Sequence, residues 1–240
     1  ENYSPSIKTY KVDMDNDYLK GVFVFSNSGL KAILNINNEI YQMRSFKSSI
    51  QTIDNLHLLS NIKDGQTDFD FICGYDDSNE IIEEINHSNN RIGNAFGCAE
   101  IVIELDYYTV QTFDTYQESV DWALEMMAVV NGLYLDEINV GIKSNSAQIW
   151  ETVDPYSSFI EEPQNMLISL RENWTNSEVL GEINRHLVHL FSKRDNTGTG
   201  GIAFLNGIGS SSNGYGFSSN LMDVEEYIDL VEPYFFWNIY

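Results

Sequence analysis

Four histidines and two cysteines are the side chains of this sequence best suited to hold a metal ion or to act as nucleophiles. His186 and His189 lie three positions apart in a segment predicted to be helical, where two imidazoles could reach one metal ion. His186 shares an apolar stripe with Ile183 and Leu190, and no acid or cysteine stands at a spacing that completes a site. We therefore favour packing or surface roles. No histidine precedes Glu, so His-Glu-x-x-His is absent; the four are His57, His87, His186 and His189.

The two cysteines lie in different surroundings. Cys73 stands in a polar stretch, whereas Cys98 immediately precedes an apolar strand. They could form one disulfide or remain as two thiols, and the sequence does not decide between these states. A thiol in an exposed linker can act as a thiolate ligand, but for Cys73 we favour a buried or disulfide-bonded residue.

Other motifs with catalytic potential are weak. The glycines of residues 199–201 and 206–210 could let backbone amides approach a phosphate, but no Lys follows to neutralise it. A serine nucleophile in Gly-x-Ser-x-Gly does not occur. A pair of catalytic carboxylates, as in glycosidases, is supported only by the large number of acidic residues.

The charge of the chain excludes whole classes of partner. There are 13 Lys+Arg against 36 Asp+Glu in 240 residues, which gives a formal net charge of −23. Such a surface repels phosphate backbones and anionic lipids, so we expect neither nucleic acid nor membrane as a partner. No apolar run reaches the roughly 20 residues that span a bilayer. The chain begins with Glu1 rather than Met, so we expect a processed chain or part of a longer one.

The elements that must position these residues divide the chain in two. Residues 20–45 alternate apolar runs with Gly and Asn turn signals, which predicts a β-meander. Residues 61–94 are rich in Asp, Asn, Ser and Glu, which indicates a linker with at most a short helix near residues 80–85. We place a boundary near Asn94. The predicted units are a β-rich segment over residues 1–95 and a second unit over 96–240.

The second unit alternates strands with helices, which predicts an α/β layered sheet, mostly parallel. Asp114 or Thr115 could cap a helix that Asn131 and Gly132 end or loosen. Pro163 can open another helix. The predicted strands cover residues 100–105, 138–142 and 202–205, and the predicted helices cover 116–130, a segment from 163, and 177–191.

As an ordered series, the segments of residues 98–240 resemble the metzincin zinc endopeptidases, in particular the adamalysin or reprolysin-like branch. The meander resembles the end of the pro-domain that precedes such catalytic domains. The segments that carry the resemblance are Glu100–Asp106, 116–133 closing on Asn131-Gly132, Asp136–Val140, Ile149-Trp150 with Asp154-Pro155-Tyr156, His189–Asp195, Gly200–Ala203 and Tyr215–Ser219.

The resemblance implies a metzincin-like upper subdomain, with a mixed, mostly parallel sheet and helices. In that family the next element after the aromatic stretch 234–240 is a helix that carries two His zinc ligands and the Glu general base. We expect this helix to lie beyond Tyr240. No residue here matches a zinc ligand or the catalytic Glu, so we assign no catalytic and no metal residue. The family's edge strand, which binds extended peptide, would fall at Tyr215, Gly216, Phe217 and Ser218. Cys73 could be the latency cysteine of a pro-domain.

The expected function is therefore part of a secreted zinc metalloendopeptidase that acts on extended peptide or protein. In the complete enzyme, zinc would polarise the scissile carbonyl and activate water while the Glu moves protons. This chain alone should bind no catalytic zinc and cleave nothing. The alternative is a non-catalytic, protease-like module that binds peptide or protein.

Overall fold

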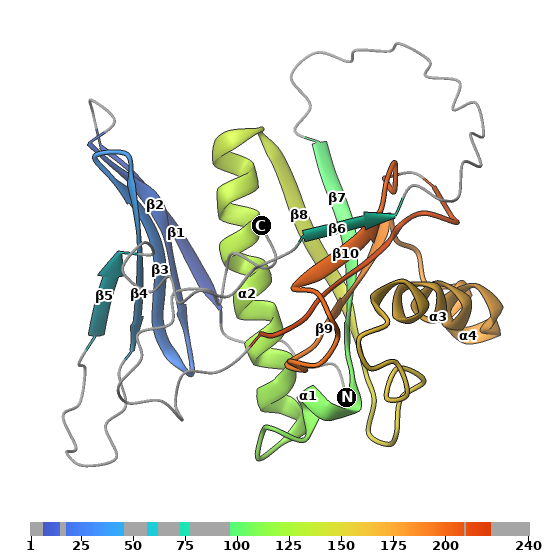
Figure 1. The fold of residues 1–240 in the computed structure, drawn as a ribbon. Coiled ribbons are helices and arrows are strands. Elements are labelled where there is room, and N and C mark those ends of the chain that lie inside the picture. Colours follow the sequence, from blue (N-terminus) through green and yellow to red (C-terminus); the bar gives the residue numbers. More distant parts are fainter. Residues whose placement is uncertain are drawn as a thin grey trace, which may run out of the picture.

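The structure is a computed structural model, and it describes residues 7–14, 18–45, 57–61, 73–76, 97–208 and 210–221. Its described elements form two sheets and four helices (Figure 1). None of the described helices is both long enough and apolar enough to cross a membrane.

The first sheet is an antiparallel meander in chain order, which confirms the meander predicted over residues 20–45. Neighbouring strands pair throughout. The turn between the third and fourth strands places Asn37 and Asn38 at φ of 53° and 64°. Two consecutive left-handed residues fit a tight hairpin, and Asn tolerates this conformation well. The strands are β1 (Lys8–Asp13), β2 (Leu19–Ser26), β3 (Gly29–Ile36), β4 (Glu39–Ser45) and β5 (His57–Asn61).

The second sheet has the order β6-β10-β11-β9-β7-β8. Among the described strands of this sheet, β10 and β11 pair antiparallel, and the four other pairs are parallel. The sheet is therefore mixed and mostly parallel, as predicted. Its strands are β6 (Cys73–Asp76), β7 (Gly97–Leu105), β8 (Val140–Ile149), β9 (Leu187–Phe191), β10 (Gly201–Phe204) and β11 (Tyr215–Ser218).

The longest helix, α2 (Tyr116–Glu137), begins at a capping box. The Thr115 hydroxyl accepts from the Glu118 amide at 3.2 Å, and the Glu118 carboxylate accepts from the Thr115 amide at 3.1 Å. The helix runs through Gly132, where the sequence predicted its end or a loosened turn. The other helices are α1 (Tyr107–Val110), α3 (Pro163–Asn176), which starts at the predicted proline, and α4 (Glu178–Gly181).

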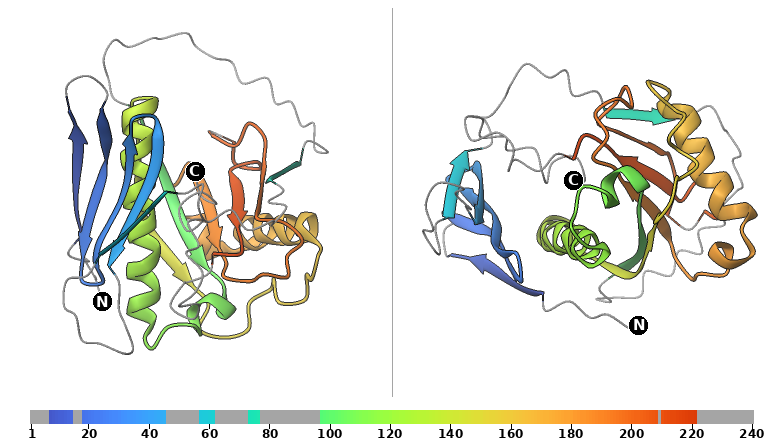
Figure 2. Two further views of the ribbon diagram at one scale, coloured as in Figure 1. Left: turned by 60° about the vertical axis from the view of Figure 1, so that its left-hand side comes forward. Right: turned by 90° about the horizontal axis from the view of Figure 1, so that it is seen from below.

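The elements lie in layers, and Figures 1 and 2 show α2 between the two sheets, with α3 and α4 on the far side of the second sheet. One apolar core lies around α2 and joins Val22, Val24 and Ile33 of the first sheet to residues of α2 and β7. A second core lies between the second sheet and α3. The two sheets therefore share a core through α2.

Three predicted elements differ from the structure. Residues 177–191 do not form one helix: Ser177 caps the short α4, and Leu187–Phe191 form strand β9. This strand is covered on both faces, so it is a nearly continuous apolar run without the alternation that marks a strand. The predicted linker contains β6, and β8 begins within the strand predicted at residues 138–142 but continues to Ile149. The predicted short helix near residues 80–85 and the boundary at Asn94 lie outside the described residues.

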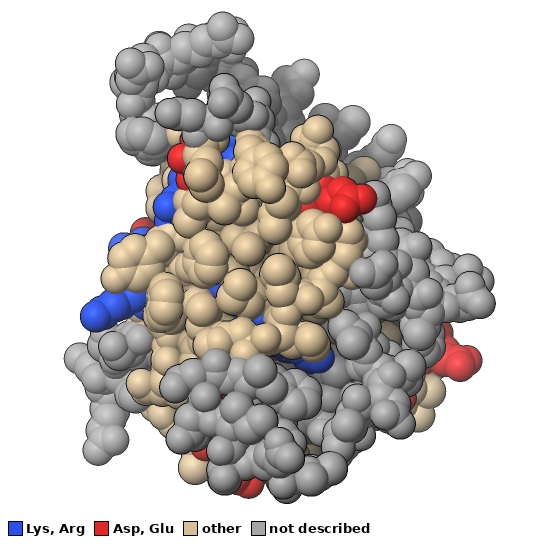
Figure 3. All heavy atoms as spheres, turned by 90° about the vertical axis from the view of Figure 1, so that its left-hand side faces the viewer, with Lys and Arg blue, Asp and Glu red and all other residues tan. Residues whose placement is uncertain are grey.

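The outer face of the first sheet, turned away from α2, is largely uncharged at its centre (Figure 3). Tyr10 and Phe25 stack edge to face with ring centroids 5.5 Å apart, and both are about half exposed. Together with Lys8 and Phe23 they line a hollow of about 600 Å³. This face takes no part in the packing against α2.

Candidate functional site

The predicted edge strand is not at an edge. Tyr215–Ser218 form β11 as predicted, but β11 lies between β9 and β10 and all four residues are buried. It pairs in parallel with β9, Tyr215 opposite Val188, and antiparallel with β10. Both backbone edges of β11 are therefore used, and no further peptide can add to it.

The strand next to the edge is β10, and its outer neighbour is a segment from the first half of the chain. Cys73–Asp76 pair in parallel with Gly201–Phe204, Cys73 opposite Gly201 and Asp76 opposite Phe204. Backbone pairing of this kind requires only an extended segment, because the hydrogen bonds are made by main-chain groups. The sheet thus accepts an extended segment along β10.

The two faces of β10 differ. Ile202 and Phe204 are buried toward α3, where the Arg171 guanidinium lies 4.8 Å from the centre of the Phe204 ring. Ala203 is exposed on the opposite face. A Cβ added to Gly216 would come within 2.9 Å of the Ala203 Cβ, so the small residues let β10 and β11 approach closely. The packing holds β10 in place on one face and leaves the other open.

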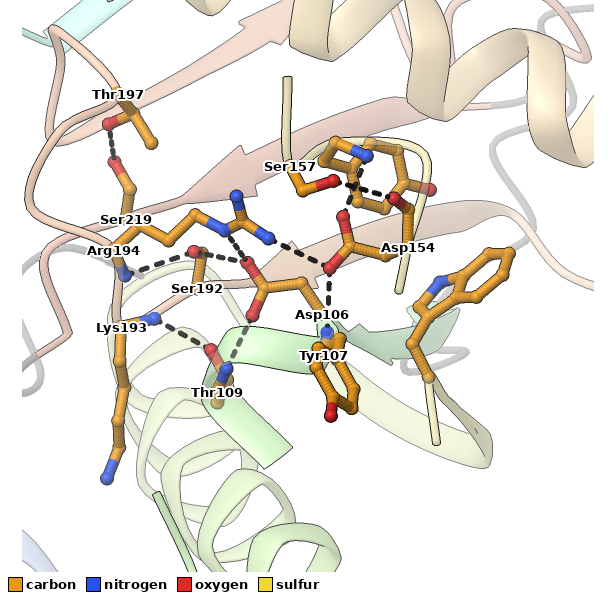
Figure 4. A network of polar contacts seen from close by, with 12 residues as sticks. Asp106, Tyr107, Thr109, Asp154, Ser157, Ser192, Lys193, Arg194, Thr197 and Ser219 are labelled. Atoms are coloured by element: carbon orange, nitrogen blue, oxygen red, sulfur yellow. Dashed lines mark hydrogen bonds and ion pairs between the residues drawn. The ribbon is translucent and has the colours of Figure 1, made fainter. Parts of the chain in front are cut away.

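A buried ion-pair network holds the loop that leads from β9 to β10 (Figure 4). Arg194 donates to Asp106 from Nε and to Asp154 from a terminal nitrogen, each at 2.8 Å. Asp106 also accepts from the Ser192 hydroxyl at 2.6 Å and from the Thr109 amide at 2.8 Å. Burial raises the pKa of Asp106, although Arg194 opposes that shift. Three segments distant in sequence are thereby fixed at the ends of β7 and β9.

The same loop is also tied to the chain after β11. The Thr197 and Ser219 hydroxyls lie 2.7 Å apart, and the Ser219 amide donates to the Gly200 carbonyl at 2.9 Å. The Asn220 amide donates to the Arg194 carbonyl at 2.7 Å. Because these bonds end one residue before β10, the network sets where β10 begins.

A second buried carboxylate, Glu104, lies at the end of β7 without a cationic partner among its hydrogen bonds. It accepts from the Tyr156 hydroxyl at 2.7 Å, from the Trp150 indole at 2.5 Å and from the Trp174 indole. Burial raises the pKa of Glu104, and burial together with Glu104 raises that of Tyr156. This cluster fastens β7 to α3 and to the loop before it.

His186 and His189 lie in different surroundings. His189 lies in β9, its Nε2 is 2.9 Å from the Ser218 hydroxyl, and desolvation lowers its pKa to about 4. His186 precedes the strand and accepts from the Glu100 amide at 2.9 Å. Within the described ranges no three His, Cys, Asp or Glu side chains are grouped so as to hold a metal ion, and His87 lies outside those ranges. Ser218 is 1% exposed, so the His189–Ser218 pair does not present a nucleophile.

The two cysteines are on different strands. Cys98 lies in β7 as an exposed, free thiol, and not before the strand as predicted. Cys73 opens β6, so the backbone of the residue considered as a latency cysteine lies on the edge of the second sheet.

Sequence reasoning missed the pairing of β10 with β6 and the place of Arg194 at the centre of the network. The doublet Gly200-Gly201 before an apolar run was visible in the sequence, but the order of the strands was not. The Asp106–Arg194 contact joins residues 88 positions apart, and no local pattern signals it.

The sequence and the fold are similar to those of known metallopeptidases. Residues 123–232 match the reprolysin-like metallopeptidases of family M12B. The fold is similar to the crystal structure of metalloproteinase-II from Bacteroides fragilis, with a TM-score of 0.51 and 10% sequence identity, over 91% of this chain and 72% of that one. No curated protein matches the sequence. The predicted resemblance to metzincin-like metallopeptidases is confirmed, and so is the metzincin-like α/β fold.

Proposed function

We propose that this chain is part of a secreted zinc-dependent metalloendopeptidase and that extended peptide binds along β10. The observation that carries the proposal is the pairing of Cys73–Asp76 with β10 at the edge of a mostly parallel sheet. A segment of substrate would replace β6 and bind through its main chain. The match to reprolysin-like metallopeptidases supports peptide or protein as the substrate class.

The described residues do not fit a catalytic zinc ion, because they contain no group of three potential ligands. We propose that this chain alone binds no catalytic zinc and cleaves no peptide bond, and that the ligands and general base of the complete enzyme lie outside it. What this chain supplies is the sheet, the open face at Ala203 and the network that sets the position of β10.

We propose that residues 1–95 act as a pro-domain-like segment and residues 96–240 as the start of the peptidase domain. In this arrangement β6 keeps the β10 edge covered until it is displaced. β6 covers β10 through main-chain hydrogen bonds, whereas a latency role for Cys73 requires its sulfur atom. A substitution that removes only the sulfur therefore distinguishes the two roles.

The edge is tested with a fluorescein-labelled peptide that has the sequence of residues 71–78. Successive amides of a strand point to opposite sides, so either Gly74→Pro or Tyr75→Pro removes a hydrogen bond to β10. We expect one of these variants to bind the peptide by fluorescence anisotropy, and the wild type and Cys73→Ser not to. Equal binding by the wild type and by both proline variants would contradict an edge covered by β6. A peptide of scrambled order controls for composition.

Catalysis is tested by adding zinc to the purified chain and assaying an unfolded protein. We expect no hydrolysis that depends on zinc and is stopped by a chelator, and such activity would refute the proposed incompetence. The alternative, a non-catalytic module that binds extended peptide, is favoured by the same edge. It predicts that a longer natural chain also shows no zinc-dependent hydrolysis while it still binds the peptide.

A further inference from the structure

The contact between the first sheet and α2 has the features of a built interface. Val22, Val24 and Ile33 are at most 6% exposed, and they belong to the same core as Met126 and Val129 of α2. Figure 2 shows the first sheet lying along α2 in both views. Apolar burial of this kind is the main source of affinity between two surfaces.

Gly132 provides a notch in α2 for one side chain of the sheet. A Cβ at this position would lie 2.3 Å and 2.7 Å from the two methyl carbons of Val22. Glycine inside a helix costs about 1 kcal/mol relative to alanine. The close approach of Val22 explains why glycine stands here.

Glu125 provides the polar part of the contact. Its side chain is 1% exposed, and Ser28 donates to its two oxygens at 2.9 Å and 2.8 Å. The Lys31 ammonium lies 2.5 Å from the same carboxylate. Ser28 lies in the β2–β3 turn and Lys31 at the start of β3. The buried carboxylate of α2 is therefore neutralised from the first sheet.

The covalent link between these surfaces is long. Residues 62–72 separate β5 from β6, and residues 77–96 separate β6 from β7, with β6 itself paired at the far edge of the second sheet. The link from the first sheet therefore leads to the far edge of the second sheet and not to α2. The contact surface itself must determine where the first sheet lies.

We propose that the face of α2 carrying Glu125 and Gly132 is a docking site for the β1–β5 sheet, and that this sheet stays bound as a non-covalent partner when the chain is cut between Asn61 and Cys73. Binding of the β1–β5 sheet to this face does not depend on peptidase activity. In this proposal the β1–β5 sheet binds α2, and β6 separately covers the edge of β10.

The experiment places a site for a sequence-specific protease within residues 62–72 and cuts the folded chain. We expect the two pieces to co-elute in size-exclusion chromatography at low micromolar concentration and to appear as one complex in native mass spectrometry. Separation of the wild-type pieces under these conditions would overturn the proposal.

Variants of the cut protein test the named contacts. Lys31→Met leaves Glu125 buried without its cation, and we expect the dissociation constant to rise by about 30-fold or more. Lys8→Met is the matched control, because Lys8 lies on the outer face of the same sheet; we expect less than about a threefold change, as for surface substitutions generally. Equal effects of the two would contradict the assigned site.

Two further variants distinguish loss of the contact from a general failure to fold. Lys31→Arg keeps the positive charge, so we expect the pieces to stay together, and Gly132→Val, which fills the notch, should separate them.

The dependence of binding on salt concentration gives a further test. Residues 1–61 have six basic and six acidic residues, whereas residues 62–240 have 7 and 30, so a general attraction between the pieces would be weak and screened. Binding that persists at high salt supports the buried contact, and binding lost at high salt contradicts it.

Discussion

At the scale of single residues, two buried titratable groups give opposite contributions to acid stability. Glu104 is fully buried, and burial raises its pKa above 4.5. The folded protein therefore holds this proton more tightly than the unfolded chain does. The contribution of Glu104 to the free energy of unfolding is fully present below about pH 4.5 and is lost as the pH rises through the folded-state pKa.

The first prediction is that Glu104→Gln removes this dependence. The difference in unfolding free energy, wild type minus variant, should fall as the pH is raised from 4.5 to 8. Urea unfolding at a series of pH values measures it. A difference that rises with pH would contradict the raised pKa of Glu104.

The second prediction concerns His189, whose pKa is lowered from 6.5 to about 4. Protonation is disfavoured in the folded state, so its contribution to stability is present above pH 6.5 and is lost as the pH falls toward 4. The loss at pH 4 is at most about 3 kcal/mol. We expect His189→Gln to lose less stability between pH 7 and pH 4 than the wild type does. An unchanged loss would show that other groups carry the acid sensitivity.

At this scale the sequence indicates residue types but not their neighbours. The sequence does not show that His189 will lie beside Ser218 in the second sheet, or that His186 will accept from the Glu100 amide. The roles of Glu104 and Arg194 could not be predicted, because each depends on partners from several elements. Nothing local marks an acid that will be buried.

At the scale of elements, α2 depends on its first turn. The third prediction is that Thr115→Ala destabilises the protein by about 1 kcal/mol, because the side-chain acceptor for the Glu118 amide is lost. Thermal unfolding should show a melting temperature lower by about 2–4 °C. Thr115→Ser keeps the hydroxyl and should stay close to the wild type, so an equal drop in both variants would argue against the cap.

The fourth prediction is a coupling between α2 and β2. Gly132→Ala favours the helix but places a methyl group 2.3 Å from the nearest Val22 methyl carbon, so we expect a net loss of about 1–3 kcal/mol. Val22→Ala leaves a cavity of similar shape. The double variant should be more stable than the sum of the two losses predicts, by about 1 kcal/mol or more. Urea unfolding of all four proteins completes the cycle, and simple additivity would mean that the two residues do not meet.

Elements with strong local signals were predictable. The Asn37-Asn38 turn and Pro163 mark the meander and the start of α3, and both lie where predicted. Strand β9 was mistaken for a helix because Leu187–Phe191 are apolar toward both faces. Tyr215–Ser218 were correctly predicted as extended, but strand order is decided by pairing between distant segments.

At the scale of the whole molecule, charge governs association. The fifth prediction is that the chain, with a net charge of −23, binds no duplex DNA at physiological salt. An electrophoretic mobility shift assay measures this, with a basic DNA-binding protein as the positive control. A retarded band at micromolar protein would reveal a local basic surface that the sequence does not indicate.

The contrast between the two sheets has a consequence for the order of folding. Each strand of the first sheet pairs with its neighbour in the chain, so this sheet has low contact order and can form early during synthesis. The pair β6–β10 joins Cys73 to Gly201, 128 positions later, and its loop closure must wait until most of the chain has emerged. The sheet that receives α2 is thus among the first parts to be complete, and the strand that covers the β10 edge is among the last to find its place.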